Sequence, residues 1–199
     1  MAESTPLPKP ASVSWRDGVP GHFLAALGLS GGFMAFVAWD QSHWWRVKDD
    51  YTFGWLVPLF TAYAVYDRWP QIQARLRAAV APPPAAGWVR WTLNAFATLG
   101  LVLGALFFLL GAFYRAGAGT SQPGTFALTC GMVAIVLPLI FFNVPVAEPQ
   151  REAGGGGPRP TAAAAGIGAL FAEARFRVAA LFIFPVLVWL ISAPLVSAI

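Results

Sequence analysis

The sequence has 199 residues, of which 57% are hydrophobic and 11% are charged, and its formal net charge is +4. Because an ordinary soluble domain carries about 25% charged residues, this composition excludes a typical soluble domain and predicts a single membrane unit. The thirteen basic residues are spread between apolar segments without a nucleic-acid motif, which excludes a nucleic-acid partner. One cysteine excludes an intrachain disulfide and a cysteine-based zinc or iron–sulfur site.

Five apolar segments follow a polar tail at residues 1–20. A bilayer core about 30 Å thick needs roughly 20 residues of helix, and four segments meet that requirement. The second is shorter: its charge-free part, Phe53 to Tyr66, has the length of a re-entrant or interfacial segment, but Trp55 and Trp69 bracket it as interfacial aromatic residues do. We predict an all-α integral membrane protein, a bundle of about five transmembrane helices in one polytopic domain (21–199), with spans at about 21–39, 52–69, 91–114, 125–147 and 178–199.

The basic residues predict the orientation of these spans. Ten of the thirteen fall on the side of the N-terminal tail, and the remaining three are Arg46, Lys48 and Arg115. The positive-inside rule therefore predicts a multi-pass protein of the bacterial inner membrane with a cytoplasmic N-terminus. A cleaved signal peptide is the alternative for residues 21–39, but the long apolar run, the preceding tail and the lack of an A-x-A site argue against it.

Few residues are candidates for chemistry. Cys130 lies inside the fourth predicted span, where an apolar environment disfavours the thiolate, so we expect a structural role. His22 and His43 stand at opposite ends of the first span, about 30 Å apart along a helix, and cannot share a metal or haem within it. The sequence has no HExxH, GxSxG or Walker motif. We therefore predict no catalytic residue, metal site or cofactor.

Several polar and small residues within the spans are expected to act in packing. Asn94 and Asn143 could hydrogen-bond between helices, and Gly100 and Gly104 form a GxxxG pattern that permits close helix approach. Five prolines are expected to kink helices or mark their ends: Pro58, Pro138, Pro145, Pro185 and Pro194.

The stretch HWWRVKDDYTFGWLVPLF, His43 to Phe60, joins the first two predicted spans on the outer side. An interfacial belt explains its three tryptophans and its two basic residues, Arg46 and Lys48. It does not explain why an acidic pair, a tyrosine, a glycine and a proline lead directly into a span.

This part of the sequence resembles the exosortase/archaeosortase family, whose outer loop is followed by a motif of the type D-x-x-Y-S-H-G-x-L-V-P and a helix that ends in tyrosine and arginine. Thr52 stands at the serine position of the motif and Phe53 at the histidine position. The matching residues in DDYTFGWLVPLFTAYAVYDRW are Tyr51, Gly54, Leu56, Val57, Pro58, Tyr63 and Arg68.

A second resemblance lies near the C-terminus, where the family has a basic loop and a span of the type F-P-x-x-F-L-x-x-x-I-P-x-P. The corresponding segment here is RFRVAALFIFPVLVWLISAPL. Its matching residues are Phe184, Pro185, Leu187, Ile191 and Pro194. Together the two resemblances cover most of residues 21–199.

Family members are membrane cysteine proteases or transpeptidases, proposed to act on C-terminal sorting signals of exported proteins. Their catalytic cysteine, arginine and histidine lie downstream of the proline-containing span, and no such region is found in this chain; Cys130, followed by Gly131 and Met132, lies one span too early. The resemblance implies the N-terminal part of such a protein, without catalysis of its own: a truncated product, half of a split protein or an inactive relative. Its expected partners are the bilayer and either an exported protein with a sorting signal or a complementary C-terminal half. The alternative is a non-enzymatic membrane scaffold that docks partners.

In either case we expect Trp45, Asp50, Tyr51 and Gly54, with Pro58 behind them, to form an ordered cap on the outer face. The glycine would let the backbone pass closely or adopt positive φ. Asp50 or its neighbour Asp49 would cap the second helix, with Arg46 or Lys48 paired to the other acid.

Overall fold

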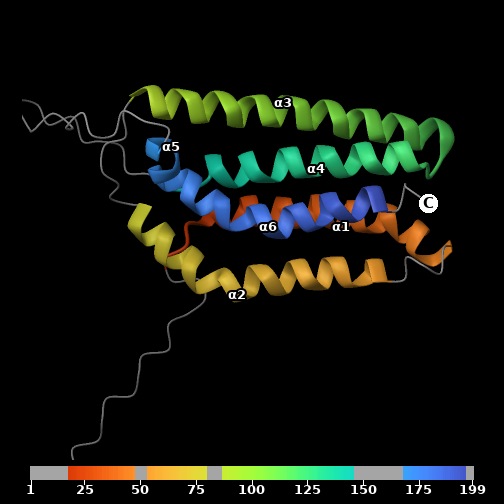
Figure 1. Cartoon of the computed structure of the whole chain (residues 1–199), viewed down its shortest axis with the longest axis horizontal. Coiled ribbons are helices and arrows are strands. Elements are labelled where there is room, and N and C mark those ends of the chain that lie inside the picture. The colour runs from red at the N-terminus through yellow and green to blue at the C-terminus, as the bar shows by residue number, and fades with distance from the viewer. Residues whose placement is uncertain (1–17, 48–52, 80–86, 146–167, 196–199) are drawn as a thin grey trace, which may run out of the picture.

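The computed structural model describes residues 18–47, 53–79, 87–145 and 168–195, and every regular element in these ranges is a helix (Figure 1). Apolar residues dominate all of the long helices, as the sequence predicted. The helices are α1 (Gly21–Val47), α2 (Leu56–Ala79), α3 (Gly87–Ala118), α4 (Gln122–Phe142), the short α5 (Gly168–Ala172) and α6 (Ala174–Leu195).

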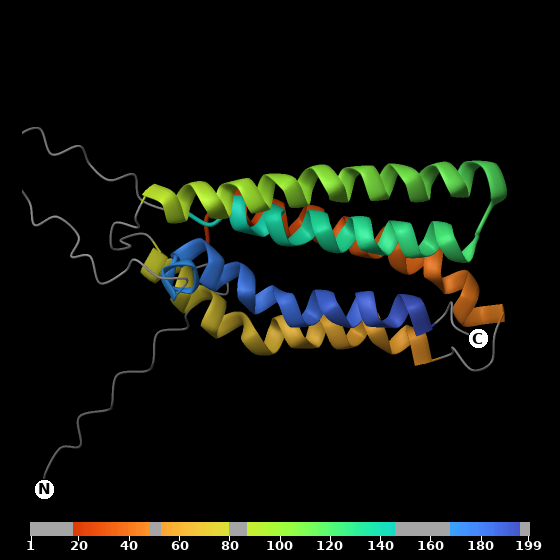
Figure 2. The ribbon, with the colours of Figure 1, turned by 45° about the horizontal axis from the view of Figure 1, so that its top comes forward.

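The five long helices run alternately up and down along one axis (Figures 1 and 2). Helix α4 packs against α1, α3 and α6, whereas α2 packs mainly against α6. We call the end where α1 finishes and α2 begins the Trp45 end, and the end where α2 finishes and α6 begins the Arg177 end. The core between them is apolar, with Leu128, Met132 and Val136 of α4 fully buried.

By length and composition, three of the described helices can cross a membrane: α1, α3 and α4. Only 11% of the most apolar window of α3 is buried, so its outer face presents leucine and phenylalanine side chains to the surroundings. Exposed Trp91 near the start of α3 and exposed Phe113 near its end lie about 33 Å apart along the helix. This spacing matches a bilayer with aromatic residues at both interfaces.

Helix α3 extends beyond its predicted span by four residues at each end, and α1 and α2 extend further. Helix α1 continues past Trp39 to Val47, so Trp45 lies on a helix and not in a loop. No glycine or proline interrupts residues 40–47, and the charge of Asp40 is compensated by Arg115. Helix α2 continues past Trp69 through Pro70 to Ala79, because its last ten residues bury Ile72 and Leu76 against the rest of the protein.

Glycines bring α3 and α4 into close contact. A Cβ at Gly104 would lie 3.0 Å from the carbonyl oxygen of Gly131, and a Cβ at Gly131 would lie 2.6 Å from the backbone nitrogen of Phe108. The same close contact recurs between Gly111 and Gly124, which lie seven residues after Gly104 on α3 and seven residues before Gly131 on α4. The predicted close approach at Gly104 is therefore confirmed: backbone packs directly on backbone, as membrane helices with small interfacial residues do.

Candidate functional site

Trp45 is the centre of the Trp45 end. Its side chain is 1% exposed and its indole lies against Gly54, where an added Cβ would overlap the ring. The Trp55 indole packs edge-on against the Trp45 ring, with 5.1 Å between the ring centroids. Gly54 lies in a short 3₁₀ turn before α2 and is not among the glycines with positive φ. Close approach, and not unusual backbone conformation, is therefore the reason that a side chain does not fit there.

Asp50, Tyr51 and the neighbouring Asp49 lie outside the described residues, so their predicted roles remain predictions. Pro58 occupies the third position of α2, in the first turn, where its missing N–H has no helical carbonyl to bond. Arg46 uses its guanidinium on its own helix: Nε donates to the carbonyl oxygen of Ser42 at 3.1 Å and Nη2 donates to the Ser42 hydroxyl at 3.2 Å.

A buried ion pair lies beside the tryptophans and was not predicted. Asp40 of α1 is 2% exposed and forms an ion pair with Arg115 near the end of α3. The hydroxyl of Thr125 on α4 donates to the second carboxylate oxygen at 2.6 Å, and Trp44 Nε1 donates to the same hydroxyl at 3.3 Å. The Arg115 guanidinium also lies 4.3 Å above the Trp39 ring. The pair thus joins α1, α3 and α4 at one point.

One turn deeper along α4, a second polar contact continues this network. Gln41 Nε2 donates to the Thr129 hydroxyl at 2.9 Å, and that hydroxyl donates to the carbonyl oxygen of Thr125 at 2.9 Å. The sequence did carry a signal for it: threonines four residues apart on an apolar helix, an acid directly after a span, and an arginine isolated on the same side. Because the predicted first span ends at Trp39, it leaves out Asp40 and Gln41, which α1 includes.

Helices α2 and α6 meet along the segments that carry the two sequence resemblances. Trp189 Nε1 donates to the Thr61 hydroxyl at 2.7 Å, and both residues are buried. The Phe60 and Phe184 rings lie edge to face, 6.1 Å apart. Arg68 lies 5.0 Å above the same Phe184 ring.

Arg68 also compensates for a helix proline. Pro185 has no N–H, so the carbonyl oxygen of Leu181 lacks its usual donor four residues on. Arg68 Nη1 lies 3.5 Å from this oxygen, a long hydrogen bond that reaches across from α2. A freed carbonyl in an apolar environment needs such a donor. Arg68, a charged residue inside the second predicted span, therefore has a structural partner in the carbonyl oxygen of Leu181.

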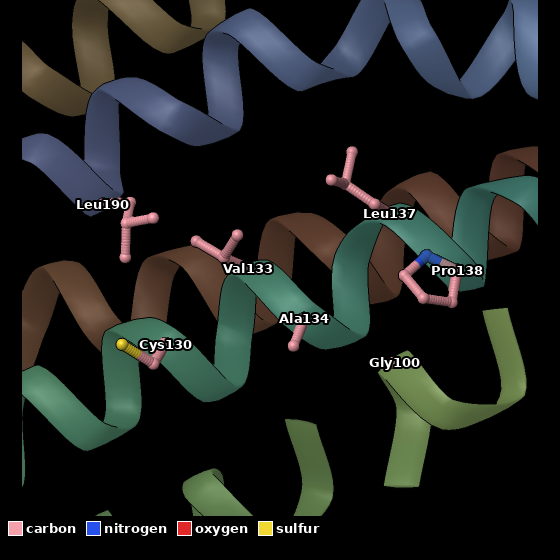
Figure 3. A pocket seen from close by; sticks show the side chains of 7 residues that line it. All are labelled: Gly100, Cys130, Val133, Ala134, Leu137, Pro138 and Leu190. Carbon is pink, nitrogen blue, oxygen red and sulfur yellow. The ribbon is translucent and has the colours of Figure 1, made fainter. Parts of the chain in front are cut away.

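Cys130 faces an apolar hollow of about 350 Å³ between α3, α4 and α6 (Figure 3). Its walls are Gly100, Val133, Ala134, Leu137, Pro138 and Leu190, which offer no base and no cation. Within the ranges that the structure covers, no three His, Cys, Asp or Glu residues gather as a metal site would require. Nothing in this hollow activates the thiol.

The two asparagines behave differently from each other. Asn94 Oδ1 accepts from Arg175 Nη1 at 3.1 Å, a bond between α3 and α6 that confirms the predicted interhelical role. Asn143 Nδ2 donates at 2.8 Å to the carbonyl oxygen of Leu139 within its own helix, so the interhelical prediction is wrong there. Asn143 ends α4 as its C-cap and bonds the local backbone instead.

Comparison with protein-family models, with curated proteins and with solved structures finds no match to this chain. The described residues hold helices together by packing, by a buried ion pair and by hydrogen bonds, and they assemble no nucleophile with a base.

Proposed function

We propose that this chain is an exosortase-like membrane protein that contributes a recognition surface for a partner and does not supply the nucleophile. One observation carries the proposal. The two segments that resemble the family are more than 100 residues apart in sequence, yet they pack against each other through Thr61–Trp189 and Arg68–Phe184. This contact allows the two segments to belong to one site, as the proposal requires.

We also propose that the chain crosses the membrane five times. Besides the three apolar helices, α6 contains from Val178 onward the start of a charge-free run of 22 residues, which is long enough to cross a bilayer. Helix α2 lies beside it and exposes Leu56, Leu59 and Tyr63 on its outer side, as a lipid-facing helix would. Both run parallel to the axis of α4 (Figure 2).

The proposed orientation rests on charge. The described basic residues at the Trp45 end are Arg46 and Arg115, whereas those at the Arg177 end are Arg75, Arg77, Arg90, Arg175 and Arg177. The positive-inside rule then places the Arg177 end and the N-terminus in the cytoplasm of a bacterial cell, and the Trp45 end outside its inner membrane.

The Trp45 end is the surface that we propose meets the partner, either an exported protein with a C-terminal sorting signal or a complementary half that carries the catalytic groups. Buried Trp45, the Gly54 contact and the Asp40–Arg115 pair hold this end rigid, and a pre-organised surface loses less entropy on binding. Exposed Trp55 and Phe53 border it and supply the aromatic area that interfaces favour.

Deletion of the gene in its host tests the proposal. Mass spectrometry of exported proteins should then find C-terminal segments retained that the wild-type cell removes, and the wild-type gene should restore their removal. A gene that carries Gly54→Leu should fail to restore it, whereas Gly31→Leu, at an open position on α1, should succeed. Identical C-termini in deleted and wild-type cells would refute a role in sorting.

A non-enzymatic membrane scaffold is the second candidate, favoured by the apolar surroundings of Cys130. In that case deletion would change which membrane proteins co-purify as a complex, while the C-termini of exported proteins stay the same.

A further inference from the structure

Two arginines meet at the Arg177 end. Arg75 of α2 donates Nη1 to the backbone carbonyl oxygen of Arg177 on α6 at 2.7 Å. The Arg177 side chain is exposed and that of Arg75 is partly buried. Both views show the second half of α2 beside the start of α6 at this end (Figures 1 and 2). This bond places the Arg75 guanidinium against the backbone of Arg177, whose own side chain is exposed at the same end.

Neither guanidinium forms an ion pair with a carboxylate in the part of the chain that the structure describes. Glu173 is already used: one oxygen accepts from Arg175 Nε at 2.8 Å and the other from the backbone N–H of Phe176 at 2.9 Å. Asp67 lies eight residues before Arg75, about 12 Å along α2. An anion that both side chains contact would therefore add an attraction between α2 and α6.

The depth of these groups in the membrane indicates which anion. Arg177 directly precedes the charge-free segment that begins at Val178. An arginine at the start of a span places its guanidinium at the level of the headgroup phosphates. Arg75 bonds the backbone of Arg177 and therefore lies at the same level.

We infer that Arg75 and Arg177 together bind the phosphate of an anionic phospholipid in the leaflet at the Arg177 end. The planar fork of arginine matches phosphate oxygens. Arg75 has five N–H donors and uses one of them on the carbonyl of Arg177. The bound lipid would pin α2 to α6. This inference rests on the five-span arrangement proposed above, but not on the proposed role in sorting.

The test uses Arg177→Gln in the full chain, because this change removes the second cation and keeps the backbone oxygen that Arg75 needs. Arg90→Gln is the matched control: it removes the same charge from an exposed arginine at the same end, on α3. Native mass spectrometry would count the phosphatidylglycerol that each purified protein retains, with phosphatidylcholine at the same concentration as the neutral lipid.

Wild type should retain phosphatidylglycerol in preference to phosphatidylcholine. Loss of one hydrogen bond to the bound phosphate weakens retention by about 1 kcal/mol, which is about fivefold. We expect that fivefold loss for Arg177→Gln, less than twofold for Arg90→Gln, and partial retention for Arg177→Lys, which keeps the charge without the fork. Equal losses in the two glutamine variants would contradict a specific site and would indicate a diffuse basic surface instead. Equal retention of the two lipids by wild type would also overturn it.

Discussion

The indole of Trp45 fills the space that a side chain at Gly54 would need. The two residues are nine positions apart and come from different elements, the end of α1 and the turn before α2. Their contact holds the end of α1 against the turn at residues 53–55, at the surface where we propose that a partner binds.

Gly54→Ala should therefore destabilise the protein by about 1–3 kcal/mol, because the added methyl group has to displace a buried indole ring. Gly28→Ala is the control, since its Cβ would meet nothing within 4 Å. Thermal unfolding in detergent measures both. A melting temperature for Gly54→Ala equal to that of Gly28→Ala would contradict the contact.

The ion pair between Asp40 and Arg115 should respond asymmetrically to mutation. Arg115→Gln leaves a carboxylate that is 2% exposed without its cation, and a loss of about 3–5 kcal/mol is expected for a buried charge of this kind. Asp40→Asn should cost less, because Arg115 is 26% exposed and can reach water. The double variant should be more stable than Arg115→Gln alone. Unfolding midpoints of the three proteins decide this, and equal costs for the two single variants would argue against a buried pair.

Close packing of α3 on α4 can be tested at Gly111. A Cβ at this position would come within 2.6 Å of the Leu128 side chain and 2.8 Å of the carbonyl oxygen of Gly124. Gly111→Ala should therefore lower stability by about 1–3 kcal/mol. Gly117→Ala, on the same helix and facing open space, should be neutral or slightly stabilising. Matching effects at the two positions would mean that the helices are further apart than described.

Arg68 and Pro185 should be energetically coupled. Pro185→Ala restores the N–H that can bond the carbonyl oxygen of Leu181, so Arg68 is then less needed. Arg68→Gln should destabilise the wild-type protein more than the Pro185→Ala protein, by about 0.5–1 kcal/mol in a double-mutant cycle. A coupling energy of zero would show that Arg68 does not compensate for the missing N–H of Pro185.

Cysteine labelling tests topology and the inertness of Cys130 together. Ala118→Cys and Ala78→Cys place thiols at exposed positions on opposite ends of the bundle, each in a Cys130→Ala background. A membrane-impermeant maleimide should label residue 118 in intact cells with a permeable outer membrane, and residue 78 only after the inner membrane is opened. Native Cys130 should stay unlabelled in both conditions. Labelling of residue 78 in intact cells would invert the proposed orientation, and fast labelling of Cys130 would reopen its role as a nucleophile.

The sequence predicted the helical membrane architecture because long charge-free runs are visible in one dimension. It also predicted the GxxxG packing at Gly104, where small residues permit close approach. Helix ends were harder to predict. The predicted first span ends at Trp39, just before Asp40, because the partner of that acid, Arg115, is 75 positions away and is brought close only by folding. For the same reason the sequence does not predict the contact of Arg68 with the carbonyl oxygen of Leu181, which is 113 positions away. Asn143 was misread because its own backbone was a nearer acceptor than any neighbouring helix.

The pairing of Arg68 with the carbonyl oxygen of Leu181 has a consequence for biosynthesis. The two residues are 113 positions apart. At about 5–20 residues per second, a ribosome needs about 6–23 s to add that length of chain. During this interval α2 is already made, but the helix against which it mainly packs does not yet exist. A charged segment that waits in this way is exposed to quality-control proteases and to chaperones of the insertion machinery. The timing of α6 synthesis therefore determines how long α2 must be protected.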